Sequence, residues 1–190
     1  ELTTKKELTE FVKFPLSLYK NNPYWVPTLI SDEVASFDKT KNPVFDNAKA
    51  FFYGAYNEKG KMVGRVVAIV NQHDLKQNIK KVRFGWLDMV DDIQVTQALL
   101  DKVAEKAREY QLEYMEGPIG FSSMDKVGLL TEGYDHLSNM MTWYSYPYYN
   151  RHLEQLGFTK EKGFVEMKFP VKNSKPEIFK KTAEAIKKRY

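Results

Sequence analysis

Cysteine is absent from this sequence, which excludes disulfide bonds, thiolate metal ligands and a cysteine nucleophile. Long apolar runs are also absent, and none approaches the roughly 18–20 residues needed to cross a bilayer. The opening residues ELTTKKELTEF are polar and charged, unlike a signal peptide. Because the chain starts at Glu1 rather than at a methionine, we expect residues upstream of it. These features favour a cytoplasmic protein that does not associate with a membrane.

The chain also lacks the basic face that folded nucleic-acid-binding domains usually show. Its net charge of +4 comes from the last residues: 172–190 hold seven Lys or Arg against two acidic residues, whereas 1–171 hold 22 basic and 23 acidic residues. We therefore expect no nucleic-acid partner. We divide the chain into a folded domain at 1–171 and a basic segment at 172–190. Ser174 and Glu177 have the spacing of a capping box, and Ile178, Phe179 and Ile186 predict an amphipathic helix. We expect that helix to lead into a further domain or to bind a protein partner through 176–190.

The first 50 residues are expected to be helical with loops. Thr4 and Glu7 have the spacing of a capping box, which predicts a helix that begins at Thr4. Pro15 should interrupt or end this helix, because proline has no backbone N–H to donate. A second helix is expected at 29–37, and a polar loop at 39–47.

Strand patterns follow from residue 50. Aromatic residues at 51–56 and an apolar run at 63–70, joined by a short turn with Gly60, predict a hairpin. A polar loop at 71–80 precedes a third strand at 82–89. A helix at 92–111 and a short strand at 112–116 complete a strand–helix–strand unit, which implies a right-handed parallel crossover.

Residues 121–146 are rich in Gly, Ser, Met and Tyr and are expected to be irregular. A further helix is expected at 148–156, and Gly157 suits its C-terminal cap. One or two final strands are expected at 158–169. This order of elements predicts an α/β fold with a mixed sheet.

Two blocks of sequence resemble the GNAT acyltransferases: KMVGRV at 61–66 and PYYNRHLEQLGFTK at 147–160. The opening FVKFPLSLYKNNPYWVP is similar to an uncharacterised bacterial group of GNAT-like proteins, and the resemblance covers about residues 4–170. It implies a central twisted mixed sheet flanked by helices, followed here by the C-terminal amphipathic helix. It also implies acetyl-CoA or another acyl-CoA as the ligand, lying where the third and fourth strands splay apart.

In the GNAT acyltransferases that this sequence resembles, the pyrophosphate of coenzyme A lies at the N-terminus of the long helix. Free N–H groups and the helix dipole favour anions there. The loop there carries an Arg and two glycines, whose places in this sequence fall on Asp91, Gln94 and Thr96. Asp92 lies beside them, and two carboxylates at this position would repel a pyrophosphate. The resemblance is therefore to a group with a degenerate coenzyme A loop.

Asp91 and Asp92 suit a bare helix end, since acidic side chains in a first turn accept hydrogen bonds from its free N–H groups. We interpret both as helix-capping residues. The alternative is that Asp88, Asp91 and Asp92 bind a hard cation such as Mg²⁺. The three histidines lack the short spacing of metal ligands, and we predict no metal site.

The predicted ligand-binding residues share one place, the mouth of the splay and the start of the late helix. They are Trp86, Asp88, Met89, Gly117, Phe121, Ser122, Ser123 and Tyr148.

The catalytic residues are not assigned by the sequence. Many GNAT enzymes place a tyrosine four residues before the Gly of the Leu-Gly-Phe block, to protonate the leaving thiolate, and that place is Leu153 here. The candidates are Tyr149, one helical turn away, and Glu132 as a general base. We favour a degenerate domain for binding or structure over a standard acetyltransferase. The alternatives are an acyl-CoA-dependent N-acyltransferase with an atypical cofactor loop, and an unrelated α/β scaffold.

Overall fold

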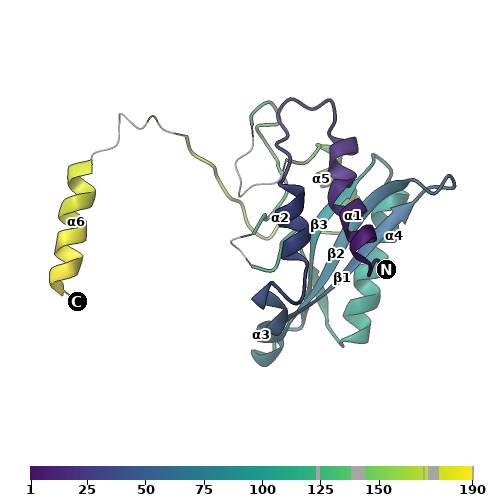
Figure 1. Cartoon of the computed structure of the whole chain (residues 1–190), viewed down its shortest axis with the longest axis horizontal. Helices are drawn as coiled ribbons and strands as arrows, with labels where there is room; N and C mark the ends of the chain where they lie inside the picture. The colour runs from purple at the N-terminus through teal and green to yellow at the C-terminus, as the bar shows by residue number, and fades with distance from the viewer. Residues whose placement is uncertain (123–124, 138–143, 169, 171–175, 190) are drawn as a thin grey trace. The chain divides into compact units, whose positions relative to one another are not determined.

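The computed structural model describes residues 1–122, 125–137, 144–168, 170 and 176–189. It divides into two compact units, Glu1–Phe158 and Thr159–Tyr190. The first unit contains one sheet in the order β1-β2-β3-β4 (Figure 1). The strands are β1 (Ala48–Tyr56), β2 (Met62–Asn71), β3 (Lys81–Met89) and β4 (Tyr114–Glu116). The first three strands pair in antiparallel fashion and β4 pairs in parallel with β3, so the predicted mixed α/β sheet is confirmed.

Helices cover both faces of this sheet. Helix α4 (Ile93–Glu109) and helix α5 (Tyr148–Gln155) pack against the face that carries Val66, Ala68 and Val70. Helices α1 (Lys5–Leu18) and α2 (Ile30–Ser36) belong to the other face, with Val67 and Ile69. All five of these β2 side chains are fully buried, which explains why the strand reads as a continuous apolar run rather than an alternating one.

Helix α1 begins with the predicted capping box and continues through Pro15. Thr4 Oγ1 accepts a hydrogen bond from the Glu7 N–H, and Glu7 Oε2 accepts one from the Thr4 N–H at 2.8 Å. The expectation that Pro15 interrupts or ends the helix was wrong, because the helix runs on to Leu18. Proline cannot donate to the carbonyl of Phe11, four residues earlier. Arg65 Nη1 donates to that carbonyl instead, at 2.8 Å, so a contact from β2 replaces the missing helical bond.

Two of the predicted polar loops contain short helices. Helix α3 (Gln72–Lys76) lies within 71–80, and the 3₁₀ helix η1 (Pro43–Asp46) lies within 39–47. Each is started by an asparagine: the side chain of Asn71 accepts from the His73 N–H, and that of Asn42 from the Val44 N–H. Asparagine at an N-cap stabilises even one helical turn. The polar composition of these segments predicted loops and did not reveal the short helices.

The predicted final strands are not present in the described part of 158–169. Residues 159–168 contain no strand, and the side chains of Phe164, Val165 and Met167 are between 71% and 83% exposed. Phe158 belongs to the first unit and packs edge-on against Phe84, with ring centroids 5.5 Å apart. The apolar residues that predicted a strand are therefore not buried as strand residues would be.

The second unit contains helix α6 (Pro176–Arg189), which confirms the predicted C-terminal helix. Its apolar residues Ile178, Phe179 and Ile186 are exposed. Ser174, predicted as its cap, lies outside the described residues. Within the described ranges, no helix combines the length and apolar character that crossing a bilayer requires.

Candidate functional site

A buried ion pair joins the two middle strands of the sheet near the end of β3. Arg65 on β2 faces Asp88 on β3 in the strand register. Arg65 Nη2 and Nε lie 2.7 and 2.8 Å from Asp88 Oδ2, and both side chains are at most 3% exposed. Charges this deeply buried are stable only when paired and hydrogen-bonded. The strand pairing therefore creates a fixed carboxylate inside the domain.

Two tyrosines, one directly after α1 and one on α5, reach the other oxygen of this carboxylate. The hydroxyls of Tyr19 and Tyr149 lie 3.0 and 3.1 Å from Asp88 Oδ1, and 2.8 Å from each other. The pKa values of both tyrosines are raised well above the usual value, chiefly by burial and then by the charge of Asp88. Both hydroxyls therefore stay protonated at neutral pH. Each is a hydrogen-bond donor beside a fixed negative charge.

Helix α5 also closes the end of strand β3. Tyr148 donates from its hydroxyl to the Met89 carbonyl at 2.7 Å, and the Met89 N–H donates to the Tyr149 hydroxyl at 3.3 Å. Burial raises the pKa of Tyr148 as well. The two backbone groups at this end of β3 are therefore occupied by side chains of the protein itself.

Side chains of the protein also occupy the N-terminal end of α4. Asp92 Oδ1 accepts a hydrogen bond from the Gln94 N–H at 2.8 Å, so its interpretation as a helix cap is confirmed. The same interpretation was wrong for Asp91, whose Oδ1 lies 2.9 Å from Arg151 Nη2 and 3.0 Å from His152 Nε2. The reason is tertiary: α5 brings two basic side chains to this aspartate.

The cation alternative at Asp88, Asp91 and Asp92 is not supported by their positions. Asp88 is bound by Arg65 and two tyrosines, and Asp91 by side chains of α5. Among the residues that the structure describes, no three His, Asp or Glu side chains come together to hold a metal ion.

The predicted splay between β3 and β4 is largely filled. The strands pair in parallel only as far as Arg83 and Glu116, after which a cis Gly117–Pro118 bond turns the chain. The Ile119 N–H then donates to the Phe84 carbonyl at 2.8 Å. A Cβ added at Gly85 would lie 2.5 Å from the Ile119 carbonyl oxygen, so this segment lies directly on β3. What remains is a shallow, solvent-open hollow, lined in part by Asp88, Leu129 and Tyr149.

The predicted ligand residues divide into two sets. The structure brings Asp88, Met89, Tyr148 and Tyr149 together around the end of β3. Trp86 and Phe121 instead pack on each other as core residues, with ring centroids 5.5 Å apart, and neither is among the residues that line the hollow beside Asp88. Trp86 has a positive φ of 47° at a bulge opposite β2, a strained conformation that turns the following residues of β3.

The other predicted residues that the structure describes are Gly117, Ser122 and Glu132. Gly117 packs closely on Phe84, and a Cβ there would collide with its ring and carbonyl. Ser122 donates its backbone N–H to Asp125 Oδ2 at 2.8 Å, and Ser123 lies outside the described residues. Glu132 is exposed and makes no hydrogen bond or ion pair within the described ranges.

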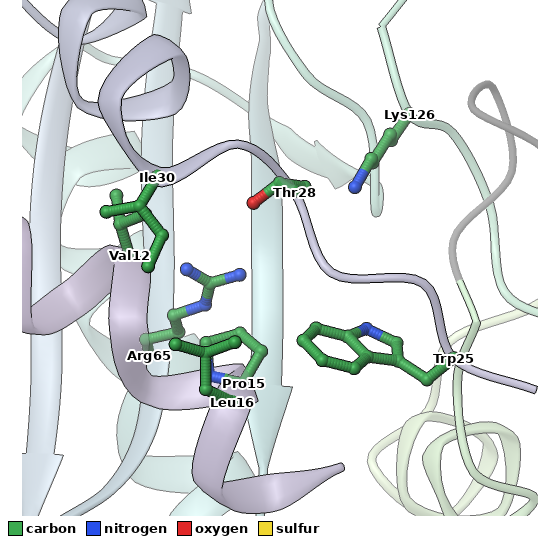
Figure 2. Close-up of a pocket in the computed structure, with 8 residues that line it drawn as sticks. All are labelled: Val12, Pro15, Leu16, Trp25, Thr28, Ile30, Arg65 and Lys126. Atoms are coloured by element: carbon green, nitrogen blue, oxygen red, sulfur yellow. The ribbon is translucent and has the colours of Figure 1, made fainter. Parts of the chain in front are cut away.

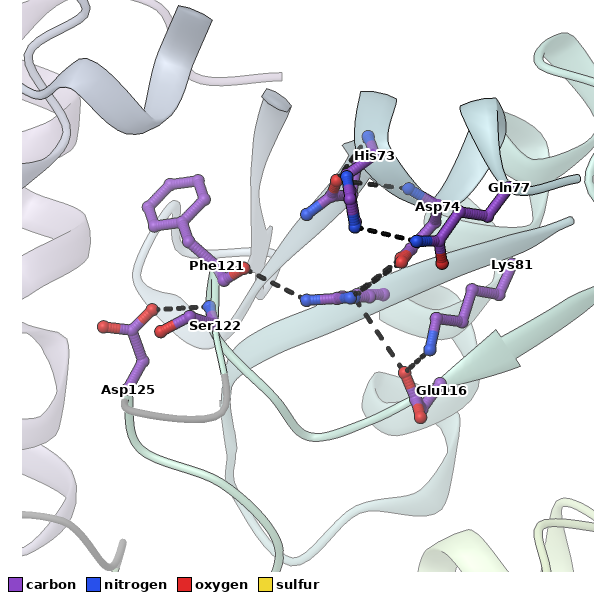
Figure 3. A network of polar contacts seen from close by, with 10 residues as sticks. His73, Asp74, Gln77, Lys81, Glu116, Phe121, Ser122 and Asp125 are labelled. Atoms are coloured by element: carbon purple, nitrogen blue, oxygen red, sulfur yellow. Dashed lines mark hydrogen bonds and ion pairs between the residues drawn. The ribbon is translucent and has the colours of Figure 1, made fainter. Parts of the chain in front are cut away.

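A charged cluster fixes the opposite end of β3 (Figure 3). Arg83 Nη2 lies 2.8 Å from Asp74 Oδ2 of α3, and its Nη1 donates to the Phe121 carbonyl at 3.0 Å. Lys81 Nζ lies 2.8 Å from Glu116 Oε2 of β4. These contacts join α3, β3, β4 and the segment after β4, which gives the cluster a structural role.

A second shallow hollow, open to solvent, lies against Arg65 (Figure 2). The rest of its lining comes from α1, the segment before α2, Ile30 at the start of α2, and Lys126. Burial is the largest effect on Lys126 and lowers its pKa. Sequence reasoning assigned no role at the site to Arg65, Tyr19 or Lys126. The signal for Arg65 was present, since it is the one charged residue inside the strand 62–71.

The chain is similar to a curated protein and to solved structures. No family model matches the chain. Protein YghO of Escherichia coli (strain K12) is 31% identical over 159 residues, which cover 82% of this chain. The aligned region is 40% of YghO, so the chain spans about two fifths of that relative's length.

Two solved structures are similar. A putative acetyltransferase from Agrobacterium tumefaciens str. C58 matches with a TM-score of 0.50 and 11% identity, over 89% of this chain and 98% of that chain. An acetyltransferase from Bacillus cereus ATCC 14579 covers 58% of this chain and 64% of that chain, with a TM-score of 0.25 and 18% identity. The first likeness confirms the predicted mixed α/β fold, with a sheet flanked by helices.

Proposed function

We propose that this chain is a GNAT-like domain in which the standard coenzyme A site is closed, and that it acts as a binding or structural module rather than as a standard acetyltransferase. The observation that carries the proposal is the occupation of Met89. An extended ligand inserted beside β3 needs free backbone groups at the end of the strand. Tyr148 takes the Met89 carbonyl and Tyr149 the Met89 N–H.

The mouth of α4 supports the same conclusion. A pyrophosphate at a helix N-terminus needs unoccupied N–H groups and a favourable local charge. Here Asp92 occupies one N–H group of the first turn and adds a negative charge, and Asp91 adds a second. The Arg151 side chain offsets part of this charge, but it is already bound to Asp91. The occupied backbone groups of Met89 oppose binding of the extended arm of coenzyme A, and the carboxylates at the start of α4 oppose binding of its pyrophosphate.

Isothermal titration calorimetry with acetyl-CoA tests this proposal. We expect no heat of binding up to millimolar ligand for the unmodified chain. The double variant Tyr148→Phe with Asp92→Gly frees the Met89 carbonyl and an N–H of the first turn, and we expect it to bind acetyl-CoA measurably. The single variant Lys59→Met, in an exposed turn, is the control. Micromolar binding by the unmodified chain, weakened by Leu87→Trp in the hollow beside Asp88, would sink the proposal.

The second candidate is an acyl-CoA-dependent N-acyltransferase with an atypical cofactor loop. The observation in its favour is that the Arg65–Asp88 pair lies between two hollows, Arg65 lining one and Asp88 the other. In such a reaction an amine attacks the acyl carbonyl to form the C–N bond and gives up a proton, the C–S bond breaks, and the leaving thiolate takes a proton. Tyr149, a protonated hydroxyl beside Asp88, is the candidate donor.

Release of free thiol from acetyl-CoA in the presence of an amine mixture measures this activity. Under the second candidate, thiol release depends on the amine and falls at least about tenfold in Tyr149→Phe, since general acid catalysis contributes roughly that much or more. Glu132→Gln tests the other predicted catalytic residue in the same assay. Under our first proposal no variant releases thiol above the rate without protein.

We further propose that helix α6 is the connection to another domain or the contact for a protein partner. Its apolar residues Ile178, Phe179 and Ile186 are exposed, and a helix with an uncovered apolar stripe is stabilised by packing. Circular dichroism of a peptide covering 172–190 tests this: we expect low helicity for the isolated peptide. A peptide that is fully helical in isolation would contradict it.

A further inference from the structure

The outer edge of strand β1 is open toward its C-terminal end. β1 lies at one end of the sheet, so its partner β2 occupies only one of its two sides. We propose that this edge binds one further antiparallel strand, formed by the polypeptide that leads into Leu2. The proposal goes beyond the closed coenzyme A site and does not depend on it, because β1 carries none of the residues that bind Met89 or cap α4.

Leu2 already occupies one position on this edge. It forms an antiparallel bridge with Phe52, and its N–H donates to the Phe52 carbonyl at 2.8 Å. Its side chain is buried in the core cluster that also contains Phe52. Antiparallel partners run in opposite directions, so this bridge sets Glu1 opposite Tyr53 and the residue before Glu1 opposite Gly54. Leu2 therefore fixes both the direction and the register of an added strand.

Gly54 presents the backbone groups that such a strand needs. Along a strand, the N–H and C=O groups of successive residues point alternately to one side and to the other. Because the Phe52 carbonyl points away from β2 toward Leu2, the groups of Gly54, two residues later, point the same way. Among the residues that the structure describes, no strand pairs with Gly54 from this side. Unpaired groups at a sheet edge are a template for strand addition.

The side chains around Gly54 favour an apolar residue opposite it. A Cβ added at Gly54 would lie 3.0 Å from Met62 Cε and 3.1 Å from Tyr56 Cε2, so a thioether and an aromatic ring flank this glycine. The Tyr56 side chain shares the face of Phe52 and Leu2 and is 45% exposed. An apolar side chain on the added strand opposite Gly54 would cover part of this exposed ring.

Acidic side chains near Tyr56 favour a basic residue opposite this tyrosine. The pKa of Tyr56 is raised chiefly by burial, and then by the charges of Glu10 and Glu7 on α1. Glu7 is bound to the start of its own helix, whereas Glu10 is exposed and has no ion-pair partner in the part of the chain that the structure describes. A lysine opposite Tyr56 would supply the opposite charge. On this face, the added strand is therefore expected to carry a basic residue and then an apolar residue before it reaches Leu2.

A segment joined to Glu1 fits this edge better than a separate peptide does. Beyond the position opposite Glu1, the residues of β1 that remain for pairing are Gly54, Ala55 and Tyr56. So short a ladder is below the usual strand length of about 5–6 residues. It would not offset the entropy that a free peptide loses on binding. A covalently joined segment avoids most of that loss, because its effective concentration at the edge is on the order of millimolar or higher.

Amide hydrogen exchange, measured by NMR on chains extended at Glu1, tests the proposal. The extension Thr-Lys-Thr-Val places valine opposite Gly54 and lysine opposite Tyr56. We expect the Gly54 amide to exchange at least about tenfold more slowly than in the unextended chain, since a paired amide exchanges only when its strand opens. The same residues in the order Lys-Thr-Val-Thr are the matched control, because this order turns valine and lysine to the opposite face and should protect less. The extension Ser-Gly-Ser-Gly should give little protection.

Equal exchange of the Gly54 amide in the unextended and the Thr-Lys-Thr-Val chains would overturn the proposal. Equal protection by both residue orders would also overturn it, since the register set by Leu2 would not matter. Val67 in β2 is the internal reference: an equal slowing there would show a general gain in stability instead of pairing at the edge. If the free peptide acetyl-Thr-Lys-Thr-Val-amide protects Gly54 as well as the extension does, the occupant is a separate strand and the proposal is wrong. The acetyl-CoA titration reports on β3 and α4, so the two proposals fail separately.

Discussion

Asp88 and Asp92 are four residues apart in the sequence, yet they lie in opposite environments. Asp88 is 2% exposed and is held by side chains from β2, α1 and α5. Asp92 is exposed, and the bond recorded for its carboxylate goes to a backbone N–H two residues away. Glu7 resembles Asp92, since its partners are Thr3 and Thr4. One kind of carboxylate joins distant segments, and the other stabilises the end of its own helix.

This difference sets the scale of the effects that substitutions should have. A buried ion pair is costly to break, because removing one partner leaves a charge without solvent or counter-charge. A helix-end carboxylate loses only a local hydrogen bond that water partly replaces. Comparing the stability lost on substitution in the two environments therefore shows whether the contacts of Asp88 stabilise the domain more than a helix cap does.

Arg65→Ala should give the largest loss of stability. It leaves Asp88 buried without its cation and the Phe11 carbonyl without a donor. We expect the free energy of unfolding to fall by about 3–5 kcal/mol, measured by urea denaturation. The control is Arg151→Ala, which removes an exposed ion pair with Asp91 and should cost about 0–1 kcal/mol.

Equal losses in Arg65→Ala and Arg151→Ala would contradict a special role for the buried pair. If Arg65→Ala does not fold, Asp88→Asn gives the same comparison with a retained shape, and it should still be more destabilising than Arg151→Ala.

Tyr149→Phe should have the next largest effect. The change removes a donor to Asp88 and the acceptor for the Met89 N–H, with no other change in shape. Hydrogen bonds to charged groups are worth about 1.5–3 kcal/mol, and we expect a loss in this range by urea denaturation. Tyr114→Phe, at an exposed position of β4, is the control. A Tyr149→Phe protein as stable as the unmodified one would show that Tyr19 alone satisfies Asp88.

The sequence predicted the local carboxylates better than the buried one. The capping box of Thr4 and Glu7, and the cap at Asp92, follow from the identity of residues within one helical turn. Asp88 was predicted as a ligand residue, but its partners Arg65 and Tyr19 were not assigned, because they are 23 and 69 residues away. The mixed sheet was predicted from strand periodicity. The filled splay was not, because it depends on how closely Ile119 approaches Gly85.

Pro15 is a case in which a distant contact overrides a local sequence rule. The local rule that proline ends a helix is sound in isolation. It was wrong here because Arg65 supplies the donor that the helix lacks, and no pattern near Pro15 announces an arginine 50 residues later. Tertiary contacts therefore decided the points where local reasoning was wrong.

Asp92→Ala tests the mouth of α4 and should have a smaller effect. It removes the side chain that accepts from the Gln94 N–H. Loss of an N-cap costs about 1 kcal/mol, and urea denaturation should show a change of this size. Asp92→Asn is the matched control, because asparagine caps as well as aspartate and should retain most of the stability. If Asp92→Asn is as destabilising as Asp92→Ala, the charge rather than the cap matters.

Glu7→Gln should have the smallest effect at neutral pH, but one with a defined pH dependence. Hydrogen bonds from the backbone N–H groups of Thr4 and Thr3 lower the pKa of Glu7 from 4.5 to about 2. Because the folded pKa is lowered, the stabilisation by Glu7 is complete above about pH 4.5 and is lost as the pH falls toward 2. The difference in unfolding free energy between the unmodified chain and Glu7→Gln should therefore shrink across this window. Glu58→Gln, in the exposed turn after β1, controls for the change in net charge. If the difference in unfolding free energy between the unmodified chain and Glu7→Gln stays constant between neutral and acidic pH, the carboxylate charge contributes nothing to the α1 cap.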